Sequence, residues 1–255
     1  MKRLFTVLFL ICTILNLCFA LSEGNEKLID TQTGDILLNR EVQFGFVFEK
    51  DGSVANSIEV GLFDWMSIGG GFRVLRLIGE DEVELEDPYF LAKFQLTPDD
   101  GKVPAIAIGW DDSDYYIPVS SGPDATVERG LYLSVSKQLV QQDYFGFKLS
   151  GGVHSPVIQN SGVGMFLGMK FNIGEKLSIS IEGDDLLASG MLSKDEIDND
   201  NDGDIDERSE DNLLARLNGG IKFKIIPELT LSVGFRHIDK ERTERIFQIY
   251  FQTEL

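Results

Sequence analysis

The sequence is poor in cysteine and histidine. Its 255 residues include two cysteines, Cys12 and Cys18, and two histidines, His154 and His237. Both cysteines lie near the N-terminus, so the rest of the chain can form no disulfide and perform no thiol chemistry. Neither histidine belongs to a recognisable catalytic motif, although Ser155 follows the first of them. We therefore expect that the protein is not an enzyme.

Positive charge is also scarce. The chain has 23 Lys and Arg against 42 Asp and Glu, which gives a net charge of −19. This balance argues against nucleic acid as a partner, because phosphates are bound by Lys and Arg. A secreted β protein without disulfides needs another source of stability. Closing the sheet into a barrel is one such source, because it removes the exposed edges.

Long hydrophobic runs are confined to the start of the chain. Overall apolar content is ordinary at 43 %, which does not suggest a helical membrane protein. Residues 4–17 are nearly all apolar and follow Lys2 and Arg3. This run is too short for a spanning helix and is typical of a secretory signal peptide, which we place at residues 1–20 with cleavage after Ala20. Lipoprotein processing at Cys18 is the alternative.

Residues 21–40 are polar and patternless, and we interpret them as a lead-in to a single domain, residues 41–255. Within that domain the sequence alternates. Leu229, Leu231, Val233 and Phe235, for example, are separated by small, polar or charged residues. A period of two predicts β-strands with one apolar and one polar face. A soluble sandwich buries the apolar faces, whereas a membrane barrel turns them to lipid.

The alternating runs number about 12, and most are long enough to cross a membrane as tilted strands. They include residues 42–48, 58–62, 68–74, 90–96, 106–110, 131–135, 145–149, 163–171, 177–181, 213–223, 229–235 and 247–251.

The connections between these runs alternate in length. Short turns lie at Asp64, Pro98, Gln141, Asn172 and Ile226, whereas the intervening loops are mostly longer, up to the acidic loop 184–212. This sorting predicts an all-β fold, an antiparallel up-and-down transmembrane β-barrel with short periplasmic turns and long outer loops. A sandwich with Greek-key connections has no reason to sort its loops in this way.

Residues 58–71 (IEVGLFDWMSIGGG) resemble a recurring phrase of bacterial outer-membrane β-barrels. Residues 104–112 (PAIAIGWDD) and 131–137 (LYLSVSK) are similar to the YjbH-like barrels associated with exopolysaccharide export. The resemblance implies contact with outer-membrane lipid and insertion by the barrel-assembly machinery. That machinery recognises a C-terminal aromatic residue in such barrels. This chain ends in Leu255, which is in phase with Phe251 but is not aromatic.

One motif indicates a metal. Within the acidic loop the sequence reads DNDNDGDID, and the candidate ligands are Asp198, Asp200, Asp202, Asp204, Asp206 and Glu210. Carboxylates at alternate positions converge when the backbone wraps around an ion, and Gly203 permits the sharp turn. Hard oxygen ligands favour Ca²⁺, so we expect a structural calcium that orders an outer loop. The other interpretation is a solvated acidic loop.

The polar faces of the strands carry most of the remaining chemistry. They hold Arg73, Lys93, Lys148, Lys170, Arg216, Lys222 and Arg236, together with Glu59 and Glu182. In a barrel these side chains point into the lumen and make it positive. Such a lumen is either a hydrogen-bonded plug or scaffold, or a narrow channel for an anionic solute or exopolysaccharide. The alternative function is that of a secreted or periplasmic soluble sandwich, a calcium-stabilised binding or adhesion module.

Overall fold

The computed structural model describes residues 27–79, 82–113, 115–117, 125–127, 130–155, 163–184, 186, 216–238 and 243–255. The signal peptide expected at residues 1–20, with Cys12 and Cys18, lies outside these ranges, as does the motif with its candidate calcium ligands. No helix within the described ranges is long and apolar enough to cross a membrane.

Within these ranges the elements are all strands. In chain order they are β1 (Glu41–Phe48), β2 (Val54–Phe63), β3 (Met66–Leu75), β4 (Glu84–Leu85), β5 (Tyr89–Thr97), β6 (Ala105–Asp111), β7 (Tyr115–Ile117), β8 (Ala125–Val127), β9 (Gly130–Gln142), β10 (Phe145–Ser155), β11 (Gly164–Ile173), β12 (Leu177–Asp184), β13 (Arg216–Ile226), β14 (Leu229–Arg236) and β15 (Glu244–Glu254).

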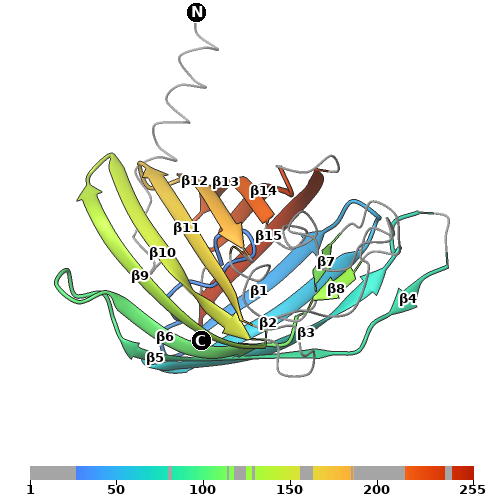
Figure 1. Ribbon diagram of the computed structural model, residues 1–255, viewed down its shortest axis with the longest axis horizontal. Helices are drawn as coiled ribbons and strands as arrows, with labels where there is room; N and C mark the ends of the chain where they lie inside the picture. The colour runs from blue at the N-terminus through green and yellow to red at the C-terminus, as the bar shows by residue number, and fades with distance from the viewer. Residues whose placement is uncertain are drawn as a thin grey trace, which may run out of the picture.

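The long strands close into one antiparallel barrel of 12 strands, with chain neighbours paired around the wall (Figure 1). The barrel closes where β1 pairs with β15, in a register that runs from Glu41 opposite Glu254 to Phe48 opposite Phe247. Strand β4 only extends the edge of β3, and β7 and β8 form a separate small hairpin. The predicted barrel is confirmed. The sandwich alternative is wrong, because one sheet closes on itself.

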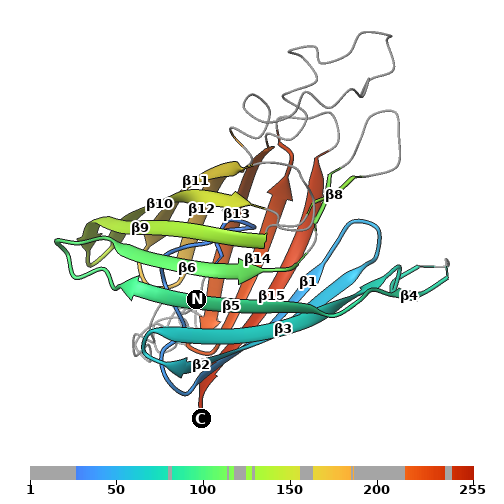
Figure 2. The same ribbon diagram turned by 60° about the horizontal axis from the view of Figure 1, so that its bottom comes forward.

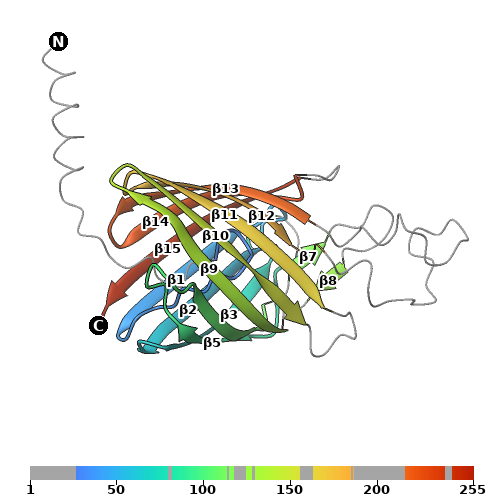
Figure 3. The same cartoon turned by 60° about the vertical axis from the view of Figure 1, so that its left-hand side comes forward.

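Short turns and long connections separate to opposite ends of the barrel. The β2–β3, β5–β6, β9–β10, β11–β12 and β13–β14 turns lie at the end where the chain terminates, on the left in Figure 3. We call this the turn end and the opposite end the loop end. In the β11–β12 turn, Gly174 has φ of 62°, a left-handed conformation that glycine adopts without strain.

Three predicted boundaries are wrong by a few residues. The turn expected at Gln141 begins later, because Gln142 still pairs with Phe145. Asp111 ends β6 and Asp184 ends β12, whereas the sequence pattern placed both at the start of loops. Both carboxylates are almost fully buried, so they face the inside of the wall. They belong to the ends of the strands and not to the loops.

The outer surface of the wall is apolar. Along β9, Leu131, Leu133 and Val135 are 47 %, 41 % and 36 % exposed, whereas Tyr132 and Ser134 between them are 4 % and 0 % exposed. Exposed apolar side chains are found on the other barrel strands as well. A water-soluble protein rarely exposes so continuous an apolar surface. The strands therefore present a hydrocarbon-compatible exterior and a polar interior.

Aromatic side chains gather near the turn end. Phe63 and Trp65 stack with ring centroids 5.2 Å apart, and Trp65 lies 6.3 Å from Phe94. On another part of the wall, Phe147 stacks on Phe171 at 4.8 Å. Rings at this level are typical of the boundary between hydrocarbon and headgroups.

The chain from Lys27 to Leu37 lies inside the barrel and is seen as the dark blue trace within the sheet in Figure 2, and Leu38 and Asn39, which are exposed, lead from it to β1. We call residues 27–39 the inner segment. Leu28, Ile29, Thr31 and Leu37 in this segment are at most 2 % exposed. The segment has no ladder with the wall and is held by side chains, as described below. The core of this molecule is therefore its lumen, filled by polar wall residues and this segment.

Candidate functional site: the barrel lumen

The nine charged residues expected to face the lumen are all buried. Their exposed fractions lie between 1 % and 8 %, and the residues are Glu59 on β2, Arg73 on β3, Lys93 on β5, Lys148 on β10, Lys170 on β11, Glu182 on β12, Arg216 and Lys222 on β13, and Arg236 on β14. Their apolar neighbours in sequence point the other way, towards the exposed exterior. The structure brings together Glu182, Arg236 and Lys222 around the start of the inner segment, as the contacts below show.

Buried acids are more numerous than sequence reasoning identified. The described residues include seven buried Lys and Arg and six buried Asp and Glu. The acids are Asp30, Glu41, Glu59, Asp111, Glu182 and Asp184. The net positive charge of the lumen is therefore smaller than the value predicted from seven bases and two acids. Asp30 was missed because it belongs to the patternless segment, and Asp111 and Asp184 because they end strands.

Glu182 binds the start of the inner segment through backbone groups. The N–H groups of Ile29, Asp30 and Thr31 donate to its carboxylate at 3.0, 2.9 and 3.1 Å. The Thr31 hydroxyl donates to the same carboxylate at 2.8 Å, and the Asn218 amide donates at 2.9 Å. Three successive N–H groups around one anion form a nest. Charge-assisted bonds of this kind are about twice as strong as neutral ones.

Arg236 binds the same part of the segment with the opposite polarity. Its Nε and Nη2 atoms donate to the two carboxylate oxygens of Asp30 at 2.9 and 2.8 Å. This bidentate geometry matches the planar guanidinium to the planar carboxylate. The remaining Nη1 atom lies 3.1 Å from Glu49 and 3.5 Å from Glu244. Arg236 is thus enclosed by three acids, one of which comes from the inner segment.

Further contacts hold the segment across the lumen. The Lys27 ammonium lies 2.8 Å from Asp111 on β6, and Lys222 on β13 donates to the Lys27 carbonyl at 2.6 Å. Nearer the turn end, Lys148 on β10 donates to the Asp35 carboxylate at 2.6 Å. The segment therefore contacts widely separated strands of the wall. Two of its carboxylates, Asp30 and Asp35, pair with wall bases.

The wall carries small residues where the segment passes. Gly34 approaches β6 so closely that a Cβ atom there would lie 2.6 Å from the Ala105 carbonyl oxygen. Its N–H donates to Ser136 at 2.7 Å, and Ser134 donates to the Thr33 carbonyl at 2.8 Å. Gly168 on β11 leaves room for Leu28, since a Cβ atom there would be 2.1 Å from the Leu28 Cδ1 atom. A side chain at Gly34 would push the segment away from β6, whereas a side chain at Gly168 would require Leu28 to turn aside.

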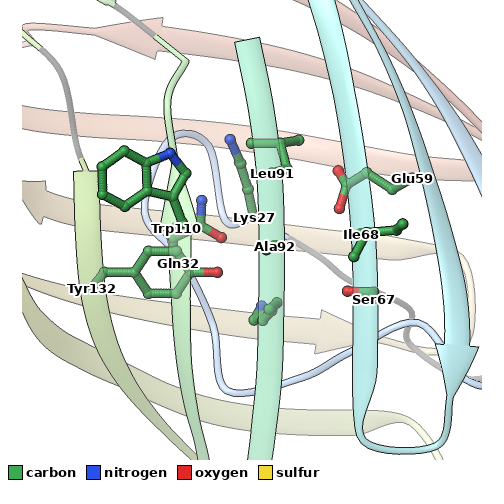
Figure 4. Close-up of a pocket in the computed structure, with 10 residues that line it drawn as sticks. Lys27, Gln32, Glu59, Ser67, Ile68, Leu91, Ala92, Trp110 and Tyr132 are labelled. Atoms are coloured by element: carbon green, nitrogen blue, oxygen red, sulfur yellow. The ribbon is translucent and has the colours of Figure 1, made fainter.

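A small cavity remains beside the segment. Figure 4 shows it between β2, β3, β5, β6 and β9, with Lys27 and Gln32 of the inner segment at its back. It is small, with room for about one water molecule. The polar lining includes Glu59, Ser67 and Lys93. The segment thus leaves the lumen narrow but does not fill it completely.

A further ion pair lies at the loop end of the lumen. Arg216 and Asp184 face each other across β12 and β13, and both are 1 % exposed. The His154 Nε2 atom lies 3.7 Å from Asp184, and its ring stacks on Phe166. Across the described ranges, no group of three His, Cys, Asp or Glu is arranged to hold a metal ion.

The closed wall, apolar exterior and charged interior define this molecule as a transmembrane β-barrel of the outer-membrane type. No protein-family model matches the sequence, and no curated protein matches it. The resemblance to YjbH-like barrels therefore gains no support from these comparisons.

Solved structures with a similar fold are outer-membrane proteins. They include the KdgM porin, at 8 % identity and a TM-score of 0.48 over 83 % of this chain and 98 % of that one. The outer-membrane protein Omp33 of Acinetobacter baumannii has 8 % identity and a TM-score of 0.45 over 84 % and 97 %. The NanC porin has 8 % identity and a TM-score of 0.41 over 84 % and 98 %.

Sequence reasoning missed the inner segment altogether. Residues 27–39 were interpreted as part of a lead-in, because they show neither period two nor any motif. The available signal was indirect. Asp30 and Asp35 are two carboxylates ahead of the first strand, and the wall carries an excess of inward bases that require partners.

Proposed function

We propose that the protein is a narrow outer-membrane channel for anionic solutes, held closed by the inner segment in the conformation described. The observation that supports this most directly is the pairing of wall bases with carboxylates of the segment. Arg236 binds Asp30 and Lys148 binds Asp35. The inner segment forms no ladder with the wall. If it served only as a structural plug, it would not need carboxylates that pair with the wall bases.

The charges of the wall alone, without the inner segment, determine whether the open channel prefers anions or cations. Of the six buried acids, Asp30 belongs to the segment; the five that remain on the wall, together with Glu49, whose side chain is 5 % exposed, stand against seven bases. An excess of fixed positive charge in a low-dielectric passage raises the local concentration of anions. The open channel should therefore prefer anions to cations.

Planar-bilayer recording tests this function. Protein reconstituted under a KCl gradient should show brief openings whose reversal potential has the sign of chloride selectivity. Glu182→Ala removes the carboxylate that binds three backbone N–H groups, and it should open the channel more often. A cation-selective current would contradict the positive lumen. Silence in both proteins would contradict channel function and favour a scaffold.

Exopolysaccharide export is a second candidate, suggested by the resemblance of residues 104–112 and 131–137. An acidic polysaccharide presents the same carboxylate chemistry as a small anion. A polymer strand needs the inner segment to leave the lumen over its whole length, whereas a small solute needs only part of it to move. Insertion by the barrel-assembly machinery and contact with outer-membrane lipid belong to either proposal.

We also propose that the acidic loop binds Ca²⁺ through Asp198, Asp200, Asp202, Asp204, Asp206 and Glu210. The proposal depends on the spacing of the carboxylates and on Gly203 in the sequence. Asp200→Ala with Asp202→Ala should remove calcium-dependent protection of the loop from proteolysis. Equal cleavage of the unchanged protein with calcium and with chelator would contradict the site.

A further inference from the structure

We infer that Asp30 and Asp35 occupy the positions at which the wall binds the carboxylates of a transported solute, so that the inner segment is a built-in competitor. This inference depends on the proposed channel function and adds a binding site and a means of control. The ligand class is a small solute that carries one or more carboxylates.

The Asp30 position has the geometry of a carboxylate site. Arg236 presents two donors to the two oxygens of Asp30 at 2.9 and 2.8 Å, and the Asn218 amide lies 3.4 Å from one of them. Glu49 and Glu244 flank the far side of the guanidinium and hold it in place. Because these partners belong to the wall or its connections, the site persists when Asp30 leaves.

The Asp35 position is a second, simpler site. The Lys148 ammonium donates to the Asp35 carboxylate at 2.6 Å, and Lys148 is 6 % exposed. A buried lysine whose partner is withdrawn pays a desolvation cost. A solute carboxylate that replaces Asp35 removes this cost. The two sites lie on β14 and β10, so the segment joins two separate parts of the wall.

Charge exchange explains why such a solute opens the lumen. When a solute carboxylate replaces Asp30, the pairing of Arg236 is conserved and Asp30 becomes hydrated outside the site. A neutral solute cannot make this exchange, because it would leave the buried guanidinium short of one acid. The contact between Glu182 and the backbone of the segment is independent of both carboxylates. It therefore provides a separate way to release the segment experimentally.

The test compares full-length variants in planar bilayers, after a heat-modifiable gel shift has shown that each is folded. Asp30→Asn with Asp35→Asn weakens both carboxylate contacts and should raise the open probability about 10-fold to 100-fold, the range expected for losing charge-assisted hydrogen bonds. Asp143→Asn with Glu175→Gln is the matched control, because it also removes two carboxylates, both on exposed turns away from the inner segment. It should leave the open probability nearer that of the unchanged protein.

A solute comparison completes the experiment. Glucuronate should raise the open probability of the unchanged protein, and glucose at the same concentration should not, since the two differ by one carboxylate. The double variant should respond much less to glucuronate. If Glu182→Ala conducts while the double variant stays closed, the inference fails and the channel function stands. An equal response to glucose and glucuronate, or an equal effect of the Asp143→Asn, Glu175→Gln control, also overturns the inference. If no variant conducts, the channel function itself fails.

Discussion

Single residues decide whether the inner segment fits. Gly61 on β2 faces the base of the segment, and a Cβ atom there would lie 1.8 Å from the Leu38 carbonyl oxygen and 2.7 Å from that of Leu37. Both contacts are with backbone, which cannot rotate away as the end of a side chain can. The Gly61 carbonyl also accepts a hydrogen bond from the Arg40 N–H at 2.9 Å. A side chain at this position must therefore push the segment away from the wall.

Gly61→Ala should accordingly open the channel without unfolding the barrel. We expect an increase in open probability of about 10-fold or more, since relieving such a clash requires displacement that costs at least about 1.4 kcal/mol. Gly151→Ala on β10 is a suitable control, because Gly151 pairs with outward-facing Leu167. Bilayer recordings of the two variants give the comparison. An unchanged open probability for Gly61→Ala would show that the segment does not control conduction.

Strand alternation predicted the wall because each strand meets two different environments. Leu133 and Ser134 illustrate this, since one is 41 % exposed on the outside and the other is fully buried inside. Strand ends were less predictable. Asp111 and Asp184 look like loop residues in sequence, and only their buried partners, such as Arg216, show that the strands include them. The local sequence shows which face of a strand is polar and which is apolar, but it does not show the strand's tertiary partners.

The short turns have chemistry of their own, best seen between β5 and β6. The Asp99 carboxylate accepts a 2.6 Å bond from Lys137 and a 2.7 Å bond from the Gln138 N–H. Burial acts to raise the pKa of Asp99, but the hydrogen bonds from Lys137, Gln138 and Gly101 outweigh it and lower the pKa to about 2. The ionised carboxylate thus joins this turn to the neighbouring strand β9.

A depressed pKa makes this stabilisation dependent on pH. The contribution of Asp99 is complete above about pH 4, the range of an unfolded carboxyl, and is lost as the pH falls through about 2. Asp99→Asn should therefore destabilise the barrel by about 1 kcal/mol at pH 7 and by little at pH 2. Urea unfolding in detergent at the two pH values measures this. Asp143→Asn in the β9–β10 turn is the control. If Asp99→Asn lost the same unfolding free energy at both pH values, the stabilising role of the ionised Asp99 carboxylate would be contradicted.

At the scale of the whole molecule, the barrel was predictable from sequence and its occupant was not. Each strand of the wall pairs with strands next to it in the chain, so sequence patterns about ten residues long predict the wall. The inner segment makes contacts such as that between Thr31 and Glu182, which are 151 residues apart. No local pattern encodes such a contact, and the polar composition of residues 27–39 is equally compatible with a solvated tail.

The central claim is that the apolar faces of the strands meet lipid around a polar interior. The described residues contain no cysteine, so single cysteines can carry a spin label at each position from Leu131 to Val135 in turn. In lipid bilayers, collision with dissolved oxygen should peak at Leu131, Leu133 and Val135 and fall at Tyr132 and Ser134. A flat profile, or one with the opposite phase, would contradict the account.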